Sequence, residues 1–307
     1  MTSVPEIVAR IGDLKPISPV STAIIDIANQ PGTGVADVAA LINSDPALAS
    51  NLLRRVNSAY FGLKQKVDTL QGAITALGTR QTIKMVLAAS MAPHYKDRRC
   101  DGYGLVANEL WKAAIISSEI AQNIALQRGH RQPNRIFTAA LIRDIGKIIL
   151  SQFVFDKIEM IQQLVVNEKI GYIEAEKRIL GITHPEIGGM VARTWNFPEP
   201  IVFIIEHHHD EDLTVAANEQ TAIVQAADAI CSMMGVGTGK DGMRYKVSPN
   251  VAEELMSENQ VENIITQTLL MKQELLDLIV DNKSGSDSVD FISQIPRTLK
   301  RDDPPTS

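Results

Sequence analysis

Apolar residues recur three and four positions apart along most of the chain, and no stretch alternates apolar and polar residues over a useful length. Start and stop signals divide this pattern: Ser3 and Thr183 begin capping boxes, and Gly78 ends one helix before Thr79 starts the next. The pattern therefore predicts an all-α fold. The expected helices cover residues 3–12, 19–30, 35–43, 46–61, 69–77, 79–91, 105–127, 134–150, 153–168 and 172–180, and further ones begin near 183, 198, 218 and 251.

The stretch 134–150 organises the chain, because its apolar residues cover most of the helix circumference and predict an interior element. Near its end lie three charged residues, Arg143, Asp144 and Lys147. A buried ionised carboxylate needs a cation, a metal or several donors beside it. Two explanations stay open: Asp144 pairs with Arg143, Lys147 or a helix N-terminus, or it joins histidines and an aspartate from other helices in a metal site.

The candidate partners of Asp144 lie downstream, each in its own helical pattern. His184 falls in the first turn of the helix that Thr183 caps, and Asp228 lies at one margin of the 218–234 helix. In the helix after Pro198, helical spacing directs His207 or His208 inward but not the third histidine of the run. We therefore expect His209 on the surface.

Composition shifts divide the chain into segments. The polar, glycine-rich stretch 93–104 predicts a boundary between two helical lobes, 1–92 and 105–235. Small residues throughout 105–127 predict a central helix that neighbouring backbones approach closely. Residues 235–246 form a glycine-rich loop, expected to be mobile, and 248–280 hold C-terminal helices. The polar remainder, 281–307, is expected to be disordered.

The composition is that of an ordinary soluble globular protein, with 45% hydrophobic and 21% charged residues among 307. A formal net charge of −6 gives no attraction to nucleic acid or to an anionic membrane, so neither is an expected partner. The two cysteines have no CxxC spacing, and no signal peptide or membrane-length apolar run is present. We expect a cytoplasmic protein.

Several motifs, in order, resemble the HDOD family, bacterial signalling modules related to HD-type metal phosphohydrolases. The resemblance covers about residues 11–229. It is carried by the segments NSDP (43–46), LLRRVNSAYFG (52–62), AITALG (73–78), LW (110–111) and AALIRDIGK (139–147), by His184 with Gly188, by Trp195 with Pro198, and by His207 with His208. It implies an all-α, two-lobed bundle whose C-terminal lobe is HD-like.

The resemblance also implies where HD enzymes bind metal: a histidine on the Trp111 helix, a His-Asp pair on the next, and a late aspartate. Here these positions read Ala113, Arg143-Asp144 and Asp228. Arginine has no lone pair for a metal and stays charged, so it repels a cation. We expect Arg143 or Lys147 to replace the metal by pairing with both aspartates. We therefore expect a non-catalytic signalling output module that needs no cofactor. Its expected partners are signalling proteins, and a second copy of the chain in a homodimer is a further candidate.

Two alternatives remain. His184 and His207 or His208 resemble the additional ligands of the HD-GYP branch, and with Asp144 and Asp228 they would hold iron, manganese or zinc in a metal-dependent phosphohydrolase or nucleotide phosphodiesterase. In the other alternative, Arg143 and Lys147 receive the phosphate of a nucleotide that is bound but not cleaved.

Overall fold

The computed structural model describes residues 3–28, 32–58, 61, 63, 65–212, 214–215, 217–241, 251 and 254–270. Over these residues the secondary structure is helical without a strand, apart from one isolated bridge between Cys100 and Leu105. The all-α prediction is therefore confirmed. The expected disorder of 281–307 falls outside the described residues, and the division into lobes stays a prediction.

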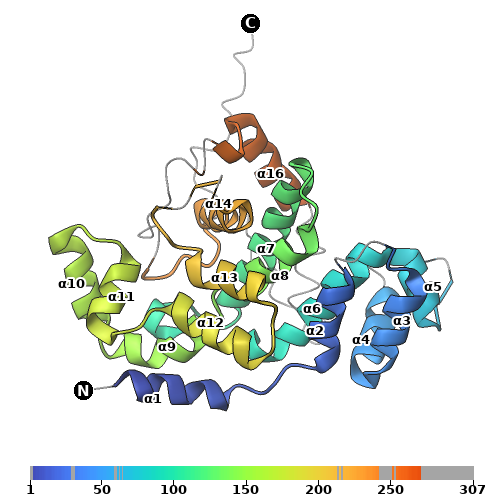
Figure 1. Cartoon of the computed structure of the whole chain (residues 1–307), viewed down its shortest axis with the longest axis horizontal. Coiled ribbons are helices and arrows are strands. Elements are labelled where there is room, and N and C mark those ends of the chain that lie inside the picture. Colours follow the sequence, from blue (N-terminus) through green and yellow to red (C-terminus); the bar gives the residue numbers. More distant parts are fainter. Residues whose placement is uncertain are drawn as a thin grey trace, which may run out of the picture.

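Most helices of the first half of the chain lie together on the right of Figure 1, whereas the first helix and the 3-10 helix after it lie apart from them. Asp45 caps its helix by accepting hydrogen bonds from the amides of Ala47 and Leu48. The first helix instead packs beside α9 (Ile145–Phe155), far along the chain. The helices are α1 (Val4–Ala9), the 3-10 helix η1 (Arg10–Asp13), α2 (Pro19–Ala28), α3 (Val35–Asn43), α4 (Pro46–Val56), α5 (Leu70–Leu77) and α6 (Thr79–Tyr95).

The second half builds the larger body around α7 and α8, near the centre of Figure 1. The small residues of α7 are all buried, so α7 packs closely against α8 and α14, as the sequence predicted. The elements are the 3-10 helix η3 (Asp101–Tyr103), α7 (Glu109–Gln127), α8 (Pro133–Ile142), α9 (Ile145–Phe155), α10 (Ile158–Glu168), α11 (Tyr172–Leu180), α12 (His184–Thr194), α13 (Glu199–His207), α14 (Glu219–Met233) and α16 (Glu258–Leu270).

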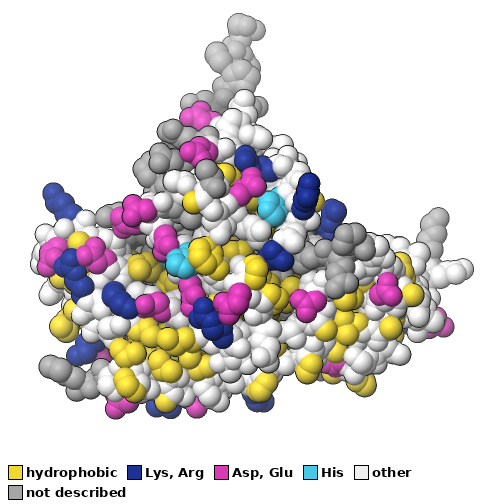
Figure 2. All heavy atoms as spheres, viewed as in Figure 1, with side chains coloured by type: hydrophobic (Ala, Val, Ile, Leu, Met, Phe, Trp, Pro, Cys, Tyr) yellow, Lys and Arg dark blue, Asp and Glu magenta, His cyan; other side chains and the backbone are white. Residues whose placement is uncertain are grey.

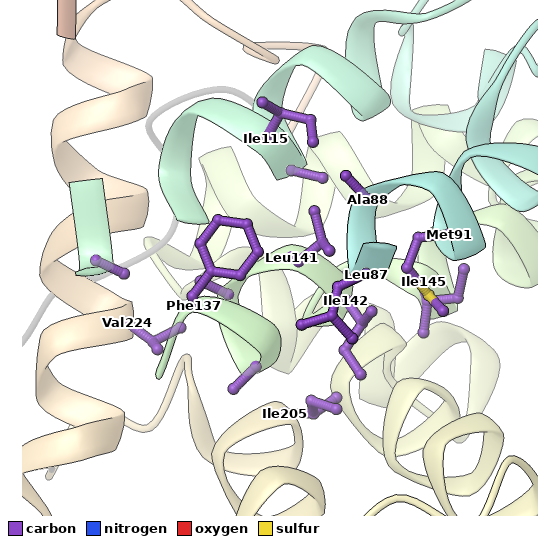
Figure 3. Close-up of a cluster of buried hydrophobic side chains, with 14 of the residues drawn as sticks. Leu87, Ala88, Met91, Ile115, Phe137, Leu141, Ile142, Ile145, Ile205 and Val224 are labelled. Atoms are coloured by element: carbon purple, nitrogen blue, oxygen red, sulfur yellow. The ribbon is translucent and has the colours of Figure 1, made fainter. Parts of the chain in front are cut away.

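Side chains from both halves meet in one hydrophobic core (Figure 3). Leu87 of α6 lies beside Ile142 of α8, Met91 of α6 lies beside Ile145, and Phe137 of α8 points toward the α7 and α14 side. All five are at most 1% exposed. The interior position predicted for the 134–150 stretch is therefore confirmed.

The prediction of one continuous helix over 134–150 is wrong. Helix α8 ends at Ile142 and α9 begins at Ile145, so Arg143 and Asp144 form a break between them. Asp144 has φ −94° and ψ 10°, and its carbonyl accepts from the amide of Lys147 at 3.0 Å, three residues on instead of four. Neither residue is a helix breaker, so the cause lies in tertiary contacts: the break directs both side chains at partners on other helices.

The predicted boundary segment 93–104 begins later than expected, because α6 continues through Pro93 to Tyr95. The end of α6 contacts both tryptophans: Tyr95 lies 5.2 Å from Trp111 and His94 lies 4.6 Å from Trp195, between ring centroids. Both indoles are buried, at 0% and 4% exposure. Both tryptophans are therefore part of the hydrophobic core.

On the face seen in Figure 2, acidic and basic side chains intermingle, with hydrophobic side chains gathered between them. Among the described residues, no helix combines the length and the apolar character needed to cross a membrane.

Candidate functional site

The candidate site surrounds the break between α8 and α9. Asp144 is the N-cap residue of α9 and is 5% exposed. Facing it are the start of α12 and the residues that follow α13. Helix α9 approaches α12 closely at Gly146, where an added Cβ would lie 2.0 Å from the carbonyl oxygen of His184. This approach positions His184 against Asp144.

Alternating charges connect the site. Asp144 pairs with Arg143 at 3.2 Å and with Lys147 at 3.1 Å. Each cation also holds a second carboxylate: Arg143 pairs with Asp228 of α14 at 2.5 Å, and Lys147 pairs with Asp241 at 3.0 Å. Three carboxylates and two cations thus form one group of ion pairs with a single negative charge in excess, and all but Asp228 are nearly shielded from water.

Both charges at the break are kept ionised by this arrangement. Burial alone would lower the pKa of Arg143, but Asp228 and Asp144 raise it above its ordinary value. Burial would raise the pKa of Asp144, but Lys147 and Arg143 hold it well below its usual range. Arg143 also donates to the hydroxyl of Ser117 and, at 3.0 Å, to the carbonyl of Ala140.

His184 connects this ion-pair group to a further buried carboxylate, Glu176 of α11. Its Nδ1 lies 3.1 Å from Glu176 and its Nε2 lies 3.4 Å from Asp144. Glu176 also accepts from the amide of His184 at 3.0 Å and from the hydroxyl of Tyr103 at 2.7 Å. Burial would lower the pKa of His184, but the charge of Glu176 and the hydrogen bonds raise it.

The histidine run after α13 is placed differently from the sequence prediction. His208 and His209 are both buried, and His207 is the outer residue, paired with Asp210 at 2.7 Å. The surface position expected for His209 is therefore wrong. Helix α13 ends at His207, so helical spacing no longer governs the two residues beyond it, and both turn inward.

The inward rings of His208 and His209 lie 4.1 Å apart between centroids. The Nδ1 of His208 lies 2.7 Å from the carbonyl oxygen of Ile205, which leaves its Nε2 facing Asp144 at 4.0 Å. Burial lowers the pKa of His208 to about 3 and lowers that of His209 as well. Both imidazoles are therefore neutral near pH 7.

Ala113 lies on α7 and is 5% exposed. The backbone at Gly237 packs against it, and an added Cβ there would lie 2.4 Å from the Cβ of Ala113. The backbone at Gly237 therefore closely covers the side chain of Ala113.

The donor atoms of Asp144, His184, His208 and His209 all lie within 4.8 Å of one another. Imidazole nitrogen and carboxylate oxygen are suitable ligands for iron, manganese or zinc, so the group could hold a transition metal. Glu176 and the Ile205 carbonyl orient two of the rings, as outer partners of metal-bound histidines commonly do. The position of Lys147 disfavours a metal here, because its ammonium lies 3.1 Å from Oδ1 of Asp144 and would repel a cation bound to that oxygen.

The sequence reasoning missed Tyr103, Ser117, Glu176 and Asp241 as site residues. A signal for Glu176 was available, because it occupies the buried stripe of α11 beside Tyr172 and Ala175. Nothing in the sequence distinguishes Asp241, which lies in a glycine-rich loop.

A family model of the HDOD domain matches residues 14–211. Among known proteins, an uncharacterized protein of Treponema pallidum (strain Nichols) is 24% identical over 205 residues, which are 66% of this chain and 38% of that protein. The chain thus spans well under half the length of that relative.

Solved structures share the fold. An HDOD domain protein of unknown function from Geobacter sulfurreducens matches with a TM-score of 0.61 and 20% identity, over 90% of this chain and 97% of its own. A candidate signal transduction protein from Marinobacter aquaeolei VT8 matches with a TM-score of 0.68 and 19% identity, over 91% and 61%. A candidate phosphohydrolase from Shewanella amazonensis SB2B matches with a TM-score of 0.62 and 18% identity, over 89% and 96%.

Proposed function

The chain belongs to the HDOD domain family, and from this we propose that it is a non-catalytic, cytoplasmic signalling module. Its output passes through a signalling protein or a small nucleotide, and its HD centre is closed by ion pairs in place of a metal.

One observation carries this proposal: both aspartates at the HD positions are held by side-chain cations. Arg143, at the position of a ligand histidine, contacts both Asp144 and Asp228. Lys147 contacts the other oxygen of Asp144. These cations neutralise the carboxylates that a hydrolase needs for its ion.

The chemistry of hydrolysis explains why this matters. A phosphohydrolase uses its metal to lower the pKa of a bound water and to neutralise the phosphate. A divalent ion entering here would meet a guanidinium and an ammonium, each about 3 Å from an oxygen of Asp144. An ion that took both Asp144 and Asp228 would leave the buried guanidinium of Arg143 without a carboxylate partner. Removing the partner of a buried charge costs several kcal/mol.

Metal content and turnover test the proposal together. Tag-free protein is loaded with manganese, iron or zinc, dialysed, and analysed by elemental mass spectrometry. We expect far less than one metal per chain and no hydrolysis of bis(p-nitrophenyl) phosphate. Stoichiometric metal that is lost in Asp144→Ala would overturn the proposal.

A second candidate function, a metal-dependent phosphohydrolase, is favoured by the donor group around Asp144. It requires the three inward histidines to take the ion while Lys147 gives up Asp144. This function predicts that His184→Ala and His208→Ala each abolish both metal retention and turnover. The signalling module predicts neither property in the first place.

A further inference from the structure

The segment Gly235–Asp241, which we call the strap, follows α14 and crosses the candidate site. It is irregular backbone, with two buried side chains: Val236 at 5% and Asp241 at 2% exposure. Val236 lies over the end of α14, where its carbonyl is 3.8 Å from Sγ of Cys231. The strap is thus fixed by an apolar anchor at one end and an ionic anchor at the other.

Between its anchors the strap lies directly on α7 and η3. Gly237 has φ +67° and touches Ala113. Gly239 packs on the carbonyl of Tyr103, where an added Cβ would be 2.0 Å from the oxygen, and the amide of Lys240 donates to that oxygen at 2.6 Å. A segment held by so few backbone hydrogen bonds opens at lower free energy than the helices beneath it.

The ionic anchor, Asp241, binds one of the two cations of the site. Asp241 approaches Lys147 at 3.0 Å, and the same ammonium lies 5.5 Å from the centre of the Tyr103 ring. A carboxylate in this place offers Lys147 what a phosphate oxygen would offer, a charged acceptor for an ammonium hydrogen bond. Asp144 is the N-cap residue of α9 and Asp228 lies within α14, whereas Asp241 belongs to the strap.

We propose that the strap is an internal competitor: Asp241 keeps Lys147 occupied, and an incoming oxyanion of the phosphate type displaces Asp241 and releases the strap from α7. This inference rests on the proposed function, because it treats the centre as a binding site instead of a metal centre. It adds two points to that function: the strap controls access to Lys147, and the ligand that binds there is negatively charged.

Cysteine labelling tests the opening step. Cys231 is 0% exposed beneath Val236, and the chain has one other cysteine, Cys100, so mass spectrometry of labelled peptides reports on Cys231 separately. We expect Asp241→Asn to speed labelling of Cys231 about tenfold or more, since it removes the ionic anchor. If Cys231 of Asp241→Asn is labelled at the same rate as in the wild type, the proposal that Asp241 holds the strap closed is wrong.

The matched control is Glu119→Gln, which breaks another buried lysine–carboxylate pair, with Lys84 at 2.8 Å, that does not touch the strap. At matched global stability, measured by urea unfolding, this variant should label Cys231 as slowly as the wild type. Equal acceleration in both variants would show general loosening and contradict the proposal. If Asp241→Asn does not fold, Val236→Ala removes the apolar anchor instead, and the same acceleration is expected.

Inorganic phosphate, titrated calorimetrically at constant ionic strength, tests the competition. Asp241→Asn should bind phosphate about tenfold tighter than the wild type, and Lys147→Gln added to it should abolish the gain. The proposal that Lys147 binds the anion is refuted if Asp241→Asn binds phosphate no more tightly than the wild type. It is also refuted if the tighter binding persists after Lys147→Gln is added. The two proposals fail separately: stoichiometric metal would overturn the signalling module, whereas the labelling and phosphate results decide the strap.

Discussion

Replacing Arg143 by methionine should lower the free energy of unfolding by about 3–5 kcal/mol, the usual cost of removing one partner of a buried ion pair. Arg143 is 1% exposed and contacts Asp144 at 3.2 Å and Asp228 at 2.5 Å. Methionine fills much of the same volume, so the loss reflects charge more than a cavity. Asp144 keeps Lys147 at 3.1 Å, which keeps the expected cost within this range.

Urea unfolding followed by circular dichroism measures this change, and Arg193→Met is the matched control. Arg193, like Arg143, pairs with a carboxylate: both of its terminal nitrogens contact Glu206. Its side chain, however, is 46% exposed. Surface pairs of this kind contribute about 0–1 kcal/mol. A cost for Arg143→Met that matches the control would refute the view that this guanidinium neutralises the centre.

The pH dependence of the same variant follows from the lowered pKa of Asp144. A carboxyl whose pKa is lower in the folded state stabilises the fold above its unfolded pKa, near 4, and this contribution is lost as the pH falls. The variant has already lost part of the contribution. The difference in free energy of unfolding between the wild type and Arg143→Met should therefore become smaller as the pH falls below about 4.

Two further predictions concern packing and a buried histidine. Gly146→Ala should cost about 1–3 kcal/mol or more, because its Cβ would meet backbone of α12 at 2.0 Å, whereas Gly12→Ala, with nothing within 4 Å, should be near neutral in the same urea assay. Burial, with Arg98 and Lys15, lowers the pKa of His94 to about 4. Unfolding below pH 6.5 therefore takes up a proton there, and stability should fall by about 1.4 kcal/mol per pH unit down to pH 4. His94→Gln should remove that slope; a slope in this variant equal to that of the wild type would contradict the assignment.

Local signals predicted much of the fold. The Thr183 capping box places the start of α12, Asp45 with Pro46 starts α4, and Gly78 separates α5 from α6, as expected. These signals work because each satisfies a helix end within three or four residues of the chain.

The failures lie where distant contacts decide the backbone. The break at Arg143 and Asp144 contains no glycine or proline and is held by partners on α7, α12 and α14. His209 turns inward because α13 ends before it, and the sequence carried no stop signal there. Helical spacing alone could not anticipate either position.

The sequence predicted only some of the ion pairs of the candidate site. We expected Arg143 or Lys147 to pair with Asp144 and Asp228; Arg143 contacts both aspartates, and Lys147 contacts Asp144. Asp241 could not be foreseen, because it reaches Lys147 from a loop nearly a hundred residues downstream. The expectation of a mobile loop from 235 also left out the packing of residues 235–241 on Ala113 and Tyr103, and residues 242–246 lie outside the described residues.

A Mn²⁺ titration monitored by electron paramagnetic resonance, run on the wild type beside Arg143→His, tests the closed centre most directly. The variant puts an imidazole at the position of a ligand histidine and removes the cation beside Asp144 and Asp228. We expect the wild type to leave the Mn²⁺ signal of free ions unchanged and the variant to reduce it. Tight, stoichiometric Mn²⁺ binding by the wild type, equal to that of the variant, would contradict the account.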